Sequence, residues 1–156
     1  MKKIIYFFIL SFFFSTISVA DEKNIQVIDG DTIHIGKLKY RFFGIDSPET
    51  KQICEKDNIK IKCGVIAKNV LKNKIANKIP ECVVKDKDRY QRLVAECFVG
   101  KESLSRFMVR EGYAVAYTQY SKDFIEDEKY AKENKLGIWA MTFQIPSEYR
   151  KSLRNK

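Results

Sequence analysis

Four acidic residues lie in the stretch VIDGDTIHIGKLKYRFFGIDSPE, residues 27–49: Asp29, Asp31, Asp46 and Glu49. The three aspartates among them could together bind a metal ion. If the Asp-Gly-Asp turn lies beside the end of the strand before Asp46, the three aspartates come close together. Carboxylates at short range repel one another, which raises their pKa values or requires a cation. A hard cation such as Ca²⁺ or Mg²⁺ prefers oxygen ligands. The stretch therefore predicts a cation site that water and substrate phosphate would complete.

Three of the seven arginines lie in this stretch or in a second motif, DRYQR. Arg41 stands in the apolar run YRFFGI, and Arg89 and Arg92 lie in the second motif. A guanidinium group binds two phosphate oxygens at once and, beside a cation, stabilises the charge that develops in phosphoryl transfer. Glu49 is placed to activate a water molecule as a general base. Each signal is weak alone, because an arginine near an aspartate is usually a structural ion pair.

The sequence contains a single histidine, His34, and this excludes several kinds of catalytic site. A histidine pair for acid–base catalysis, a histidine–metal nuclease site and a histidine-rich zinc centre all need more. The sequence also lacks GxSxG, a Walker loop and GxGxxG. His34 lies between two isoleucines in a strand-like run, where alternation predicts a solvent-facing residue. The chemistry must therefore come from carboxylates and arginines, with or without a bound metal ion.

The elements that must position these residues follow from the hydrophobic pattern. Runs of β-branched and apolar residues predict strands at 24–28, 32–35, 39–45, 81–84 and 93–98. Helical spacing of apolar residues predicts helices at 64–78, 102–111 and 124–135. Five short strands with a helix between the third and fourth describe an α+β domain. That order is compatible with a five-stranded OB-type barrel with three helices, a fold that commonly binds oligonucleotides.

Four cysteines follow the N-terminal segment: Cys54, Cys63, Cys82 and Cys97. Four cysteines allow three pairings, and sequence alone does not formally choose among them. Cys82 and Cys97 lie in two strand-like runs that flank the turn KDKDRYQR, so a hairpin would bring them opposite each other. We therefore predict disulfides Cys82–Cys97 and Cys54–Cys63. A zinc site is the alternative, but there is no CxxC pair and the one histidine is distant in sequence.

The N-terminal residues MKKIIYFFILSFFFSTISVADE have the pattern of a secretory signal peptide with cleavage after Ala20. The apolar run at 4–17 is shorter than the roughly 20 residues that span a bilayer. An uncleaved anchor is the alternative. Without residues 1–20, which hold two lysines and no acidic residue, the net charge falls from +9 to +7. Such a charge favours an anionic partner, nucleic acid or a membrane surface, although solubility alone explains it equally well.

The rest of the chain suits one domain, which we assign to residues 21–145. The basic segment at 146–156 includes SEYRKSLRNK and is expected to fray as a terminal tail. A signal peptide followed by cysteines that can form disulfides predicts a secreted or periplasmic protein. We expect no stable membrane association after the signal is removed.

Five motifs in their order along the chain resemble the thermonuclease family, the secreted nucleases similar to staphylococcal nuclease: VIDGDTI, YRFFGIDSPE, DRYQRLVA, MVREGYAVAY and KLGIW. The resemblance covers nearly all of the mature chain. It implies a five-stranded OB-fold barrel with three helices in a monomer. It also implies Ca²⁺-dependent cleavage of DNA and RNA with little base preference, contacts mostly to phosphates, and 3′-phosphate products.

The resemblance also implies a role for each matching residue. Asp31 and Asp46 would bind Ca²⁺ through their side chains, and Ser47 through its backbone carbonyl. Arg41 and Arg92 would be the catalytic arginines that bind phosphate, and Glu49 would activate or orient the attacking water. The motif match further assigns substrate contacts to three residues: Arg89, Tyr90 and Tyr117.

Two residues depart from the family pattern. Ser47 replaces the more usual threonine, which matters little if its carbonyl is the ligand. Gln91 replaces the glycine that usually lies between the tyrosine and the arginine of DRYQR. If that turn needs a positive φ, Gln91 strains the turn or changes its shape, and Arg92 could be displaced.

Two other functions compete with a nuclease. The first is a non-catalytic OB-fold module that binds nucleic acid without cutting it. Such a module has no reason to retain the metal-binding, phosphate-binding and base residues all at once. The second is a cationic protein that acts on membranes, which the sequence does not favour because it lacks an amphipathic helix with a broad basic face.

Overall fold

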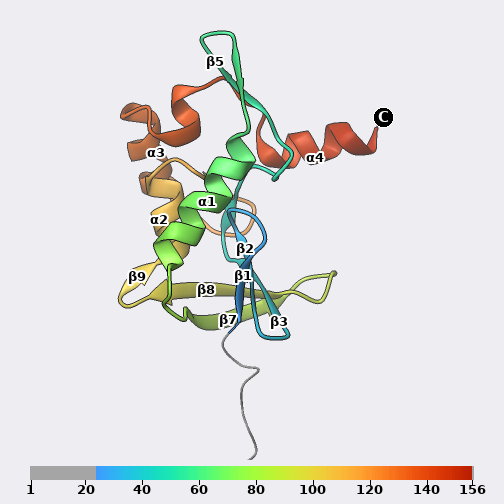
Figure 1. The fold of residues 1–156 in the computed structure, drawn as a ribbon, viewed down its shortest axis with the longest axis vertical. Coiled ribbons are helices and arrows are strands. Elements are labelled where there is room, and N and C mark those ends of the chain that lie inside the picture. The colour runs from blue at the N-terminus through green and yellow to red at the C-terminus, as the bar shows by residue number, and fades with distance from the viewer. Residues whose placement is uncertain (1–23, 156) are drawn as a thin grey trace, which may run out of the picture.

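The computed structural model describes residues 24–155, and the predicted signal peptide lies outside this range. Its main sheet has the strand order β1-β2-β3-β8-β7, with the strands β1 (Ile25–Val27), β2 (Thr32–Ile35), β3 (Leu38–Phe42), β7 (Glu81–Lys87) and β8 (Leu93–Val99). Neighbours pair antiparallel except β3 and β8, which run parallel. The parallel pair joins the N-terminal meander to the β7–β8 hairpin (Figure 1). A strand is therefore present at each of the five predicted positions, although the predicted bounds are not all reproduced.

Alternation of side chains decides which face of each strand meets the core. Along β8, Ala95, Cys97 and Val99 are buried and the residues between them are only partly so. The neighbouring strand β7 is almost fully exposed and carries the charged run KDK at its end. Charged residues on an edge strand disfavour pairing with a second chain. The sheet thus has one buried face and one protected edge.

Four helical segments precede the C-terminal segment: α1 (Cys63–Ile75), α2 (Leu104–Arg110), α3 (Ile125–Glu133) and the short 3₁₀ helix η1 (Gly137–Ala140). Helices α1 and α2 contact the main sheet, and α3 packs against α2 and η1. Ala67, Leu71 and Ile75 recur every four residues on α1 and are fully buried. The hydroxyl of Ser103 accepts a hydrogen bond from the backbone N–H of Arg106 at 3.1 Å and caps the start of α2. The three predicted helices are present with boundaries shifted by one to three residues.

Short strands complete the fold: β4 (Ile45–Asp46), β5 (Cys54–Lys56), β6 (Ile59–Ile61), β9 (Glu102–Ser103) and β10 (Val115–Ala116). The predicted strand at 39–45 is interrupted, because Gly44 has a φ of +72° and the chain turns there. The two residues after this turn, Ile45 and Asp46, pair antiparallel with β10. Asp46 is thereby held at the edge of the core rather than in the main sheet.

Both predicted disulfides are present. Cys82 and Cys97 are register partners in the β7–β8 hairpin, and Cys54 is joined to Cys63. The second bond ties the start of β5 to the first residue of α1. It therefore closes a loop of the chain that begins a few residues after Glu49.

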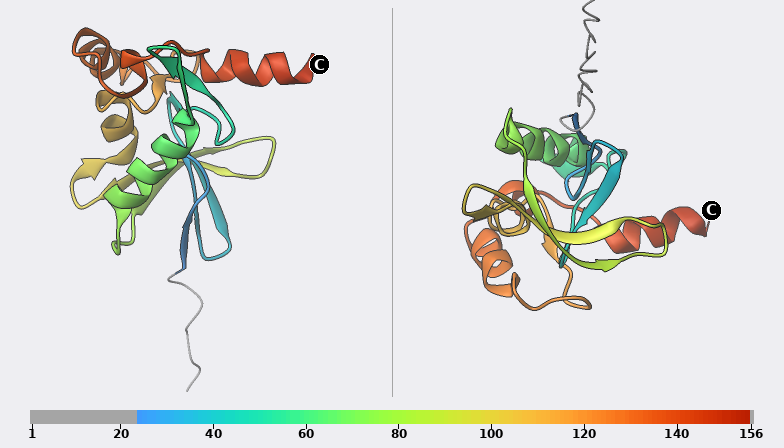
Figure 2. Two further views of the ribbon diagram at one scale, coloured as in Figure 1. Left: turned by 45° about the horizontal axis from the view of Figure 1, so that its top comes forward. Right: turned by 90° about the horizontal axis from the view of Figure 1, so that it is seen from below.

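The expected frayed tail is instead a helix, α4 (Pro146–Arg154). Proline fits the first turn of a helix because its missing N–H would have no partner there, and Pro146 is also buried. Helix α4 extends away from the rest of the molecule on the same side as the tip of the β7–β8 hairpin (Figure 2). Among residues 24–155, no helix is both long enough and apolar enough to cross a membrane.

Candidate active site

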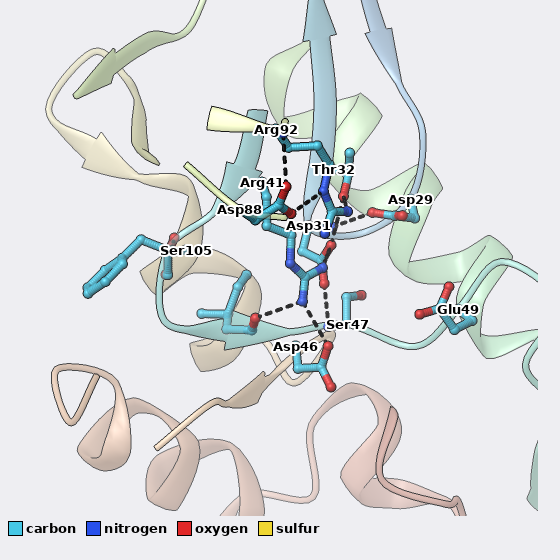
Figure 3. A network of polar contacts seen from close by, with 12 residues as sticks. Asp29, Asp31, Thr32, Arg41, Asp46, Ser47, Glu49, Asp88, Arg92 and Ser105 are labelled. Carbon is cyan, nitrogen blue, oxygen red and sulfur yellow. Dashed lines mark hydrogen bonds and ion pairs between the residues drawn. The ribbon is translucent and has the colours of Figure 1, made fainter. Parts of the chain in front are cut away.

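The predicted acidic and basic residues converge at the end of the β2–β3 hairpin. Asp31 directly precedes β2, and the next residue, Thr32, is the register partner of Arg41 on β3. The backbone N–H of Phe42 donates to the carbonyl of Asp31 at 2.8 Å. Asp46 follows on β4, so Arg41 lies between the two aspartates (Figure 3).

Arg41 bridges the two buried aspartates. Its Nη1 pairs with Asp31 Oδ1, and its Nη2 donates to Asp46 Oδ1 at 2.8 Å and to the carbonyl of Ile45 at 3.3 Å. Asp31 and Asp46 are each only 1% exposed, so their charges need partners in place of water. Burial lowers the pKa of Arg41, and the attraction of Asp46 opposes that shift. One guanidinium group therefore holds both predicted metal ligands.

Further hydrogen bonds fix Asp31 and the segment after β4. Asp31 Oδ2 accepts from the backbone N–H of Ser47 at 2.8 Å, and its Oδ1 accepts from Thr32 Oγ1 at 3.0 Å. Ser47 Oγ in turn donates to the carbonyl of Tyr113 at 2.9 Å. The side chain of Asp31 is thus tied to the backbone of Ser47 through the N–H of Ser47.

Asp29 stabilises the turn before β2. Its Oδ1 accepts a hydrogen bond from the backbone N–H of Asp31 at 3.0 Å, which is the pattern of an Asx turn. Burial raises the pKa of Asp29, although the charge of Arg41 opposes this shift. Asp29 therefore orients the backbone of Asp31 within the acidic cluster.

Glu49 lies in the loop after β4, and its side chain is about a third exposed, at 36%. Its backbone N–H donates to Gln52 Oε1 at 3.3 Å, and Gln52 Nε2 donates to the carbonyl of Gln144 at 2.6 Å. Gly64 on α1 lies so close that a methyl group there would overlap the carbonyl of Glu49. The loop backbone is therefore fixed while the carboxylate can still reach solvent.

Arg92 enters the site from the β7–β8 hairpin. Its Nε donates to Asp88 Oδ2 at 2.7 Å, and its Nη1 lies 3.5 Å from Thr32 Oγ1 (Figure 3). Gln91 has a φ of +65°, so the turn has the conformation that normally favours glycine. The chain accepts the strain at Gln91, and Arg92 still reaches the strand that begins beside Asp31. Displacement of Arg92 by Gln91 is therefore not observed.

The remaining predicted substrate contacts lie at the rim of this cluster. Tyr90 is 64% exposed, and the guanidinium carbon of Arg89 lies 4.9 Å from the centre of its ring. Tyr117 follows β10, and its backbone N–H donates to the carbonyl of Gly44 at 2.8 Å, next to β4. Its ring centre lies 4.9 Å from that of Tyr120. The exposed rings of Tyr90 and Tyr120 and the half-buried ring of Tyr117 suit stacking with bases or sugars.

The site also contains an arginine that sequence reasoning missed, Arg150 on α4. Its Nη1 donates to Asp46 Oδ1 and to Glu49 Oε1, both at 2.9 Å, and its Nη2 donates to Asp46 Oδ2 at 3.0 Å. Partial burial alone would lower the pKa of Arg150, but these hydrogen bonds outweigh it and raise the pKa. Arg150 is separated from Asp46 by 104 positions and belongs to no motif, so only the structure reveals this contact.

The donor atoms fit a weakly held hard cation. Within residues 24–155, no three side chains of His, Cys, Asp or Glu are arranged as a metal site. Two carboxylates and a backbone carbonyl are nevertheless the oxygen ligands that Ca²⁺ accepts, with water and substrate as the other ligands. Asp31 and Asp46 meet at one guanidinium group, so positive charge between them is already favourable. The residues present therefore fit Ca²⁺ of modest affinity.

Similarity to known proteins agrees with this geometry. A family model described as staphylococcal nuclease homologue matches residues 39–141. The chain is also 30% identical over 162 residues to an uncharacterized endonuclease of Haemophilus influenzae, covering 96% of this chain and 86% of that protein. The chain belongs to the staphylococcal nuclease family.

Two further relatives extend the comparison. An uncharacterized endonuclease of Escherichia coli O157:H7 is 28% identical over 131 residues, which cover 78% of each chain. A probable staphylococcal-like nuclease of Oryza sativa is 30% identical over 129 residues, which cover 81% of this chain but 36% of that protein. Family membership makes the chain a nuclease that acts on nucleic acid, and its α+β architecture is the OB-type fold of the family.

Proposed function

We propose that this protein is a secreted or periplasmic, Ca²⁺-dependent nuclease that hydrolyses DNA and RNA without base preference and leaves 3′-phosphate ends. The observation that carries this proposal is the convergence of two buried aspartates on Arg41, with Glu49 nearby. A binding module without catalysis would need only exposed cationic and aromatic residues, and two buried carboxylates would weaken its hold on phosphate.

Asp31, Asp46 and the carbonyl of Ser47 would hold Ca²⁺. When bound, the cation supplies Lewis-acid stabilisation of negative charge on a phosphate oxygen. The buried position of both aspartates favours this role, because low exposure to water strengthens their attraction for a cation. Asp29 supports it indirectly by fixing the turn that carries Asp31.

The two arginines and Glu49 would divide the remaining chemistry. Arg41 and Arg92 bind the non-bridging oxygens of the scissile phosphate and stabilise the charge that develops there. Glu49 accepts a proton from a water molecule while the water oxygen bonds to phosphorus. The bond from phosphorus to the 5′ oxygen then breaks, that oxygen takes up a proton, and the phosphate remains on the 3′ side.

The residues at the rim would bind the polymer on both sides of the scissile bond. Arg89 would contact a neighbouring phosphate from the exposed hairpin turn, and Tyr90 and Tyr117 would contact the sugar or base. Contacts made mainly to phosphate give little base preference and weaken steeply with salt. The protein would act as a monomer, since this set of residues comes from one chain.

Export is supported by the two disulfides, which persist in oxidising compartments. The predicted signal peptide at residues 1–20 is consistent with this but lies outside the described residues. Secretion can be tested by sequencing the N-terminus of the protein recovered from the medium or the periplasm. An N-terminus that begins after Ala20 is the expected result.

The activity is tested with the purified mature protein, plasmid DNA and a single-stranded RNA, each with Ca²⁺ or with a chelator. Cleavage of both substrates with Ca²⁺ alone is expected, and end-labelling of the products should reveal 3′-phosphates. Glu49→Gln should lower the cleavage rate by about 10²–10⁴-fold, as expected for loss of a general base, while DNA affinity stays within about threefold.

The matched control is Glu81→Gln, which removes the same charge from an exposed position on β7. Its cleavage rate should equal that of the unmodified protein. Retained DNA binding without cleavage at any Ca²⁺ concentration would instead identify a non-catalytic module. An unchanged rate in Glu49→Gln would refute the role of Glu49 alone.

A further inference from the structure

Arg150 engages both oxygens of Asp46. Oδ1 accepts from Arg41 at 2.8 Å and from Arg150 at 2.9 Å, and Oδ2 accepts from Arg150 at 3.0 Å. The same Nη1 of Arg150 that contacts Asp46 also contacts Glu49 Oε1. One guanidinium group on α4 therefore links the proposed metal ligand to the proposed general base.

A cation bound by Asp46 would conflict with this arrangement. A metal ion takes up a lone pair of a carboxylate oxygen, and the oxygen of Asp46 that is free of Arg41 is held by Arg150. Arg150 and the cation therefore compete for Asp46.

Helix α4 has few contacts with the domain beyond its first turn, so Arg150 can move away from Asp46 and Glu49. Its contacts with the domain lie near its start, where Pro146 is buried and the hydroxyl of Tyr149 lies 3.5 Å from the carbonyl of Lys51. Beyond Arg150 the helix is largely exposed, and Leu153 is 52% exposed. Little buried surface is lost if the helix moves, so the ion pairs to Asp46 and Glu49 make up much of its attachment.

We propose that Arg150 is a positioning residue that couples cation binding at Asp46 to release of Glu49. Until a cation binds, the guanidinium group holds Asp46 and Glu49 together and offsets part of their negative charge. Arg150 would leave Asp46 when a cation binds there, and because its Nη1 contacts both carboxylates, it would release Glu49 in the same movement. Glu49 is then free to accept a proton from water, and α4 is loosened. This inference rests on the proposed Ca²⁺-dependent function.

The first test measures binding of Ca²⁺ alone by titration calorimetry in the unmodified protein, Arg150→Gln and Arg154→Gln. Loss of the competing guanidinium should tighten Ca²⁺ binding in Arg150→Gln by at least about fivefold, the lower end of typical coupling between sites. Arg154 lies one turn further along α4 and is exposed, so Arg154→Gln should stay within about twofold of the unmodified protein.

The variant Arg150→Lys tests whether the positive charge of residue 150 is sufficient or whether its forked hydrogen bonds are also required. A lysine ammonium is a point charge and does not reproduce the forked contacts to Asp46 and Glu49. Its Ca²⁺ affinity should therefore lie between those of the unmodified protein and Arg150→Gln. An affinity equal to that of Arg150→Gln would still support the coupling, because it shows that the forked geometry is required.

The second test follows hydrogen exchange of the backbone amides of α4, which does not depend on catalysis. In the unmodified protein, Ca²⁺ should speed exchange in α4 while exchange in α1 stays constant. In Arg150→Gln, exchange in α4 should be fast already and should not respond to Ca²⁺. Protection of α4 that is the same with and without Ca²⁺ in the unmodified protein would overturn the coupling.

The inference and the proposed function fail in different ways. Equal or weaker Ca²⁺ binding by Arg150→Gln, with Ca²⁺-dependent cleavage intact, would overturn the role of Arg150 and leave the nuclease function in place. No Ca²⁺ binding and no cleavage in any of the proteins would overturn both. Tighter binding in Arg150→Gln together with faster exchange in α4 is the combination that supports the coupling.

Discussion

Two arginines donate to the same oxygen of Asp46, but one lies on an internal strand of the sheet and the other on a helix that projects from the domain. Arg41 comes from β3, which is paired on both sides by β2 and β8, and its side chain is 15% exposed. Arg150 comes from a projecting helix, and its side chain is 34% exposed. Burial lowers the pKa of Arg41, whereas hydrogen bonds raise that of Arg150.

The comparison separates a permanent contact from an exchangeable one. If Arg41 left, the buried Asp31 would lose its guanidinium partner and Asp46 would lose one of its two. Arg150 can leave by movement of a helix that buries little surface. The two guanidinium groups lie at similar distances from Asp46, but these distances do not determine how strongly each group is held. The burial of each arginine and the element that carries it determine that strength.

The largest expected effect is that of Arg41→Gln on stability. Removing one partner of a buried ion pair typically costs about 3–5 kcal/mol, because the remaining charges are left without compensation. Unfolding in urea, followed by the fluorescence of the single tryptophan Trp139, would measure the loss. Lys39→Gln, an exposed change on the same strand, is the control and should change stability by less than about 0.5 kcal/mol. A loss below about 1 kcal/mol in Arg41→Gln would show that the site tolerates unpaired aspartates.

A smaller effect is expected for Arg150→Gln in the same unfolding assay. Arg41 still pairs with Asp46 in this variant, and Arg150 itself is about a third exposed. The loss should be about 1 kcal/mol or less, as for ion pairs near the surface. A loss as large as that of Arg41→Gln would mean that α4 is an integral part of the fold and cannot move independently.

The smallest effect concerns a third arginine, Arg92, whose partner Asp88 lies in the hairpin turn. Partial burial tends to raise the pKa of Asp88, but hydrogen bonds from Arg92 and Tyr90 outweigh it, and the pKa lies below its usual 3.8. A carboxylate with a lowered pKa stabilises the fold above its unfolded pKa, and this contribution disappears as the pH falls through the folded value. Asp88→Asn should therefore lower the melting temperature slightly near neutral pH. The difference should vanish in strong acid, and a difference that persists there would exclude the ionised carboxylate as its cause.

Local sequence signals predict the strands of the sheet, the Cys82–Cys97 disulfide and the proximity of Asp31 to Asp46. Alternation in LVAECF and the turn chemistry of DRYQR are properties of neighbouring residues, and they place Cys97 opposite Cys82. The glycine expected at Gln91 correctly indicates a positive φ. Gly44 also interrupts a strand that looks continuous in composition, because its φ is positive where the chain turns toward β10.

Arg150 could not be predicted for a different reason. Its partners, Asp46 and Glu49, lie about a hundred positions earlier, and a helix with Arg, Lys and Glu on its surface is indistinguishable from a solvated tail. The one local sign of order was Pro146 at a position that suits the first turn of a helix. Contacts that depend on where a terminal helix docks need three-dimensional information.

Gly64 has no functional group, yet its closeness to the carbonyl of Glu49 lets it set the position of the proposed proton acceptor. A methyl group at this position would push the peptide of Glu49 away from α1, and the carboxylate would move with it. A variant or a distant relative could therefore retain each charged residue of the cluster, fold and bind nucleic acid, and still be inactive. Inspection of the charged positions alone would misclassify such a sequence as a working enzyme, whereas the identity of residue 64 would reveal the defect.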